Sequence, residues 1–118
     1  MDENMQKLAM LQQQICEKYY SKCNPIKPNE MVAIALQTLG QQPINGSRVI
    51  LREGEMISWF IFCGEYSEAV DFYQPMHASH LDQYLPQVIP YLALDHGFNF
   101  IIDDDGYEDV SCEMTEKN

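Results

Sequence analysis

The stretch "FNFIIDDDGYEDVSC", residues 98–112, decides how the last third of the chain folds. Apolar and polar residues alternate on both sides of Asp-Asp-Gly, which is the pattern of a β-hairpin. A three-residue loop at 104–106 with Gly106 in the left-handed conformation places Phe100 opposite Val110, and the first residue of the stretch opposite the last. A two-residue turn would instead pair apolar with polar residues. We therefore predict the first register.

Two further strands and a helical region are predicted before this hairpin. The segments "SRVILRE" (47–53) and "MISWFIFCGE" (56–65) are rich in β-branched and aromatic residues and predict strands joined by a tight turn, after a loop at "QQPING". Trp59 is predicted to lie in the core. The segment 64–80 has no clean period and predicts a long surface loop that contains one helical turn. In "SHLDQYLPQVIPYLALDHG" (79–97), apolar residues recur at helical spacing, and Pro86 and Pro90 predict one kinked helix or two short ones.

The N-terminal part is predicted to be helical. Apolar residues recur at helical spacing between residues 5 and 19 and predict a first helix. Asn29 is a plausible N-cap for a second helix, which Gly40 would end. The prediction is an α+β fold with two N-terminal helices, a small, mainly antiparallel sheet of about four strands, and a kinked helix before the last hairpin. One domain is expected over 1–118, with a helical part at 1–40, a sheet-containing core at 41–113 and a tail at 114–118.

Charge is distributed very unevenly along the chain. Residues 1–52 carry six Lys/Arg and four acids, whereas residues 53–116 carry fourteen acids and no Lys or Arg; the formal net charge is −11. Such a span projects a negative potential of several kT. Direct nucleic-acid binding and binding to an anionic membrane are therefore not expected, whereas basic proteins and divalent cations are plausible partners.

The chain shows no secretory signal and no apolar run of the roughly 18 residues that a membrane helix needs, which predicts a cytoplasmic protein. The four cysteines are scattered without a C-x-x-C pair, so we expect small buried side chains and no zinc site.

The acidic cluster at 103–109 raises the question of a cation site. An EF-hand loop with Gly106 in sixth place would need oxygen ligands at Ile101 and Cys112, whose side chains offer none. A looser site built from Asp103, Asp105 and Asp109 stays open.

Catalysis has little support in the sequence. His77 and His80 are three residues apart and could hold a metal with Asp71, although their simpler role is to begin a helix. No nucleophile elbow, glycine-rich phosphate loop or Cys/His/Asn combination is present. We therefore predict a protein that is not an enzyme and needs no cofactor.

Several motifs together resemble a known family. The ordered series "TLGQQPINGSRV", "WFIFCGE", "DFYQPMHASHL" and "LPQVIPYLALDHGFNFIIDDDGYEDV", from Thr38 to Val110, is similar to the bacterial immunity protein 33 family, which is found beside polymorphic toxins. Ser111 stands where that family has an aromatic residue, and His96 stands where it has proline. The resemblance implies a non-catalytic immunity protein that binds and neutralises a cognate toxin.

Charge and expected exposure, rather than the resemblance, predict which surface binds. Acidic side chains complement a basic toxin site, and exposed aromatic side chains serve as anchors. The predicted partner-binding residues are Glu65, Tyr66, Glu68, Asp71, Phe72, Tyr73, Asp103, Asp104, Asp105, Tyr107, Glu108 and Asp109. Two alternatives remain: a divalent-cation-binding or metal-dependent hydrolytic domain that uses the 103–109 cluster, and a stand-alone acidic adaptor.

Overall fold

A computed structural model describes residues 2–27 and 29–112. Its helix and strands are α1 (Asp2–Lys18), β1 (Met31–Ile34), β2 (Ile44–Arg48), β3 (Trp59–Cys63), β4 (Gln74–His77), β5 (Phe98–Ile102) and β6 (Glu108–Cys112). Three 3-10 helices complete it: η1 (Leu36–Thr38), η2 (Ala78–Gln83) and η3 (Pro86–Tyr91).

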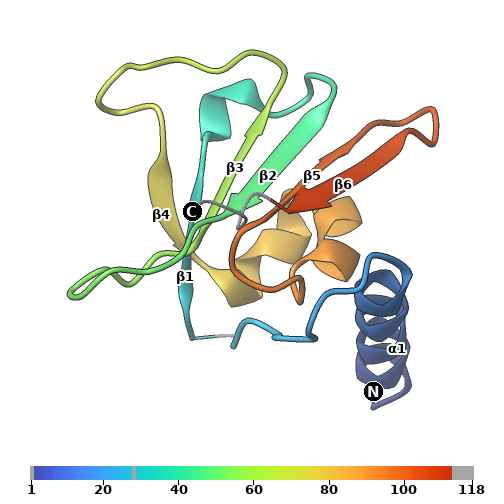
Figure 1. The fold of residues 1–118 in the computed structure, drawn as a ribbon. Coiled ribbons are helices and arrows are strands. Elements are labelled where there is room, and N and C mark those ends of the chain that lie inside the picture. The colour runs from blue at the N-terminus through green and yellow to red at the C-terminus, as the bar shows by residue number, and fades with distance from the viewer. Residues whose placement is uncertain (1, 28, 113–118) are drawn as a thin grey trace.

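The strands of the described residues form one sheet in the order β4-β1-β3-β2-β5-β6 (Figure 1). β1 runs parallel to β3, and the other neighbouring pairs are antiparallel. The prediction of two N-terminal helices and a mainly antiparallel sheet of about four strands is therefore wrong. The fold is a sheet-rich α+β arrangement with one main helix and a mixed sheet.

The predicted second helix is the largest error. Met31–Ile34 forms β1, and only the next few residues coil into η1. β1 lies between β4 and β3, and three of its four residues are buried. A strand covered on both faces is apolar throughout, so its hydrophobic period does not distinguish it from a buried helix. Pairing with the neighbouring strands β3 and β4 makes this segment a strand. Gly40, with φ of +95°, lies in the turn after η1 and does not end an α-helix.

Two further strand assignments also differ. The predicted loop 41–46 contributes its second half to β2, whereas residues 49–58 leave the sheet and project beyond its end (Figure 1). We call this segment the arm. The predicted loop 64–80 contains the edge strand β4, in which Pro75 lies opposite Ala33. Proline cannot donate to a ladder, so it suits an edge.

The hairpin register is confirmed. Phe98 pairs with Cys112 and Phe100 with Val110, and Gly106 has φ of +92°. The region 79–97 forms two short 3-10 helices, and Pro86 opens the second of them, as one of the two alternatives anticipated.

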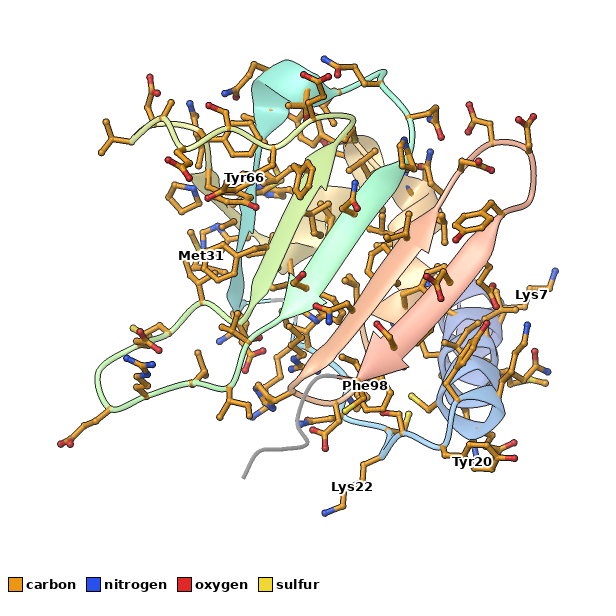
Figure 2. The ribbon with its side chains drawn as sticks, turned by 45° about the horizontal axis from the view of Figure 1, so that its top comes forward. Lys7, Tyr20, Lys22, Met31, Tyr66 and Phe98 are labelled. Carbon is orange, nitrogen blue, oxygen red and sulfur yellow. The ribbon has the colours of Figure 1, made fainter. Side chains whose placement is uncertain are left out.

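The core lies between one face of the sheet and α1, η2 and η3, which lie on that side (Figure 1). Trp59 is fully buried there, as predicted, and its indole nitrogen donates to the Leu92 carbonyl oxygen at 3.1 Å. The side chain of Phe100 fills the space over Gly46. We call the opposite side of the sheet, which no helix of the described residues covers, the open face (Figure 2).

Candidate functional site

Two loops that are far apart in sequence lie at the same end of the sheet. β3 and β5 both pair antiparallel with β2, and their last residues, Cys63 and Ile102, both lie opposite Ile44. The loop 64–73 and the hairpin turn 103–107 therefore leave the sheet at the same end (Figure 1). The topology thus places the two predicted acidic segments at the same end of the molecule.

This acidic end carries six carboxylates, of which Asp103 is half-buried and the others are exposed: Glu65, Glu68, Asp71, Asp103, Asp104 and Asp105. None of them forms an ion pair with any residue that the structure describes. Two basic side chains, Arg48 and Lys18, interact with other parts of the fold. Arg48 is only 4% exposed and donates to the carbonyl oxygens of Asn24 and Leu94 at 2.6 and 2.8 Å, and Lys18 pairs with Glu108.

Asp103 shapes the hairpin turn. Its Oδ1 accepts hydrogen bonds from the backbone N–H groups of Asp105 at 2.9 Å and Tyr107 at 3.0 Å. The backbone N–H of Asp104 donates to the side-chain oxygen of Gln42 at 3.1 Å, which ties the turn to the loop before β2. Asp103, one of the predicted partner-binding residues, therefore holds in place the turn that carries Asp104, Asp105 and Tyr107.

The open face presents two rows of side chains that cross four strands. One row runs Phe62, Asn45, Ile101 and Asp109, and the other runs Phe60, Ser47, Asn99 and Ser111. Each row starts with an aromatic residue on β3 and ends with a polar or acidic residue on β6. Alternation along β2 and β5 places Ile44, Phe98, Phe100 and Ile102 on the core side and the residues of these rows on the other side.

A groove of about 590 Å³ lies over the middle of the open face. The side chains that define it are Asn45, Ser47, Phe62, Asn99, Ile101 and Ser111. Within residues 2–27 and 29–112, the side chains of Ser47, Asn99 and Ser111 have no hydrogen-bond partner, and Asn45 has a single long contact of 3.4 Å to the Pro43 carbonyl oxygen. The groove therefore offers polar groups that the fold leaves available.

The loop 64–73 folds back over the open face beside this groove. Phe62 lies 5.7 Å from Tyr66 and 6.0 Å from Phe72 between ring centroids, and Phe60 packs edge-on against Tyr73 at 5.2 Å. Phe72 is 3% exposed, whereas Tyr66 is 58% exposed and lies in front of the sheet (Figure 2). Phe72 therefore anchors the loop, and Tyr66 is the aromatic side chain that a partner can reach.

Glu108 faces away from this site. It points to the helix-covered side, where its carboxylate accepts from Lys18 Nζ at 2.8 Å, the Tyr91 hydroxyl at 2.5 Å and the Tyr19 hydroxyl. Burial alone would raise its pKa, but these three donors outweigh burial and lower the pKa of Glu108 to about 2. Burial and the Glu108 charge raise the pKa of Tyr91.

The predicted partner-binding residues thus fall into two groups. Exposed or half-exposed at the acidic end or on the open face are Glu65, Tyr66, Glu68, Asp71, Tyr73, Asp103, Asp104, Asp105, Tyr107 and Asp109. Phe72 and Glu108 hold the fold. The polar groove residues were not among the predictions, although the alternation in "INGSR" and "FNF" was a signal for polar side chains on an uncovered face.

The structure does not gather the residues of the possible cation site. Asp103 supports the turn, Asp105 is exposed in the turn and Asp109 lies on the open face. His77 and His80 are close, with ring centroids 5.8 Å apart. Among the described residues, no group of three or more His, Cys, Asp or Glu side chains is placed to hold a metal ion.

Comparison with known proteins gives one match. The family model described as the Imm33-like domain matches residues 11–113. No curated protein and no solved structure matches the chain. In the part of the chain that the structure describes, no helix combines the length and the apolar character needed to span a membrane.

Proposed function

The chain belongs to the Imm33-like domain family, and we propose that it is a non-catalytic immunity protein that binds a basic toxin through the acidic end and the open face. The family indicates an immunity role, and with it a toxin as the general kind of partner. The basic character of the toxin and the surface that meets it are our additions. As part of the same proposal we place the protein in the cytoplasm.

One observation carries the proposal: carboxylates from two separate loops gather at one end of the sheet without a neutralising cation among the described residues. Keeping like charges together costs free energy, so such an arrangement is expected where an oppositely charged partner binds. Tyr66 and Tyr107, which are 58% and 53% exposed, supply aromatic contact area next to the carboxylates.

The mechanism follows from this chemistry. A toxin that acts on nucleic acid needs cationic side chains to hold phosphate groups, and carboxylates fixed on a folded surface can occupy the same positions. The immunity protein then blocks the toxin by covering that cationic site, and no bond is made or broken. Electrostatic attraction also speeds the encounter, which matters for a protein that must capture its toxin before damage occurs.

Coexpression with the toxin encoded beside its gene tests the proposal. We expect the protein to restore growth of cells that produce the toxin and to copurify with it. A variant with Asp104→Lys and Asp105→Lys should rescue growth less well at equal protein level. Lack of rescue by the unaltered protein, together with no complex in the pull-down, would rule out the immunity function for this pair.

A further inference from the structure

We infer that the groove on the open face is the centre of the toxin interface and receives an arginine side chain of the toxin. This inference rests on the proposed function and deepens it. The acidic end accounts for attraction at long range, but its carboxylates lie around a turn and a loop rather than in a cavity. The groove, at about 590 Å³, is a concave feature of the open face.

The groove has the acceptors that a guanidinium needs. Two carboxamides, Asn45 and Asn99, lie on the adjacent strands β2 and β5, and hydroxyl groups come from Ser47 and Ser111. Ser47, Asn99 and Ser111 have no side-chain hydrogen bonds within the described residues, so their oxygen atoms can accept without breaking an existing contact. Arginine carries five N–H donors in a planar fork and can reach several of these oxygens at once.

The two sides of the groove also suit a guanidinium. Phe62 forms one side, and a guanidinium stacks favourably on an aromatic face. Asp109, exposed and without an ion-pair partner among the described residues, lies beside Ile101 on the opposite margin. Among the described residues that line the groove, the one charged residue is Arg48. It is buried and directs its guanidinium to carbonyl oxygens of Asn24 and Leu94, away from the open face. No described cation therefore competes for the site.

The surface around the groove points to a protein as the source of the arginine. Val49 and Ile50 of the arm line the same groove and are 39% and 59% exposed, and Met56 farther along the arm is 81% exposed. Apolar surface thus continues well beyond the cavity, as in a protein interface with an apolar centre and a charged rim. A second copy of this chain fits less well, because its formal net charge of −11 would bring like charge to an acidic surface.

Two substitutions in the groove test the inference, each with a control that has the same change in charge. Asn99→Lys puts a cation in the groove, and Ser111→Asp adds an anion. Gln87→Lys and Gln87→Asp make the same changes on η3, on the covered side of the sheet. The dissociation constant for purified, inactivated toxin is measured by calorimetry, with melting curves to check folding.

We expect Asn99→Lys to weaken binding by about tenfold or more and Ser111→Asp to strengthen it, while both Gln87 variants stay within about twofold of the unaltered protein. Should Asn99→Lys fail to fold, Ser111→Lys on the exposed strand β6 replaces it with the same expectation. If the two groove variants bind the toxin with the same dissociation constants as the two Gln87 variants, the inference is overturned and the proposed function is left intact. Loss of toxin binding by the unaltered protein would overturn both.

An arginine-specific probe gives an independent reading. Hexa-arginine and hexa-lysine peptides are titrated into isotope-labelled protein, and the changes in amide chemical shifts are measured by NMR. We expect the arginine peptide to shift the side-chain amides of Asn45 and Asn99 more than the lysine peptide does. Equal effects of the two peptides, or shifts confined to the turn 103–107, contradict the inference. So does a concentration-dependent dimer that Asn99→Lys dissociates, because a second copy would then occupy the groove.

Discussion

Among single residues, Glu108 joins the most distant parts of the chain. It lies on β6, and its carboxylate accepts from Lys18 and Tyr19 at the end of α1 and from Tyr91 at the end of η3. Lys18 is well exposed, so solvent screens its ion pair with Glu108 and the pair contributes little to stability, whereas the hydrogen bonds from the two tyrosine hydroxyl groups are partly buried. The sequence presents Glu108 as one of five neighbouring acids, and only the pairing of β6 with β5 shows that it faces the other way.

Glu108→Gln tests this role. We expect the free energy of unfolding at pH 7 to fall by about 1–2 kcal/mol, because three donors lose a charged acceptor. The pKa of Glu108 is lowered from 4.5 to about 2, so its contribution is present above pH 4.5 and is lost as the pH falls towards 2. Urea denaturation at several pH values should show the gap between the two proteins closing over that range. Asp109→Asn, on the open face, is the control, with an expected change below about 0.5 kcal/mol. An equal gap at pH 7 and pH 2.5 would contradict this account.

At the level of elements, local sequence patterns predicted the strand pairing correctly where the two strands are adjacent in the sequence. The β5–β6 register follows from alternation and from Gly106, and both act within fifteen residues. β1 could not be found in this way, since its partners β3 and β4 come from residues 59–63 and 74–77. Gly46 shows the same limit. Glycine suggests a loop, but Gly46 lies within β2, where the Phe100 ring covers it and an added Cβ would clash with that ring.

The hairpin turn makes a prediction about Asp103. Its carboxylate accepts from two backbone N–H groups, so Asp103→Ala should lower the free energy of unfolding by about 1 kcal/mol. Asp103→Asn keeps an acceptor oxygen and should restore most of the loss. Asp104→Ala, one residue along and exposed, is the control and should change little. Thermal and urea unfolding of the three variants provide the measurement, and an Asp104 variant as unstable as the Asp103 variant would show that Oδ1 does not hold the turn.

For the whole molecule, the fold turns an uneven charge sequence into a directional surface. The span 53–116, which contains acids but no Lys or Arg, includes β3 to β6. The topology places the loops 64–73 and 103–107 of this span at one end of the sheet. The arm, with Arg52, projects from the opposite end. Charge counts along the chain predicted an acidic protein, but the direction of its field required the strand order.

This asymmetry predicts how binding to a basic toxin depends on salt. Replacing Asp104 and Asp105 by lysine should slow association by about tenfold at low ionic strength and flatten the salt dependence of the rate, because the steering charge changes sign. Dissociation should change less, since exposed rim charges act mainly on the encounter. Glu53→Lys with Asp82→Lys changes the net charge equally, but Glu53 lies on the arm and Asp82 on η2, so this control should keep nearly the original rate. Surface plasmon resonance at several salt concentrations measures both rates. Equal slowing by the two double variants would mean that net charge alone, and not the acidic end, guides the toxin.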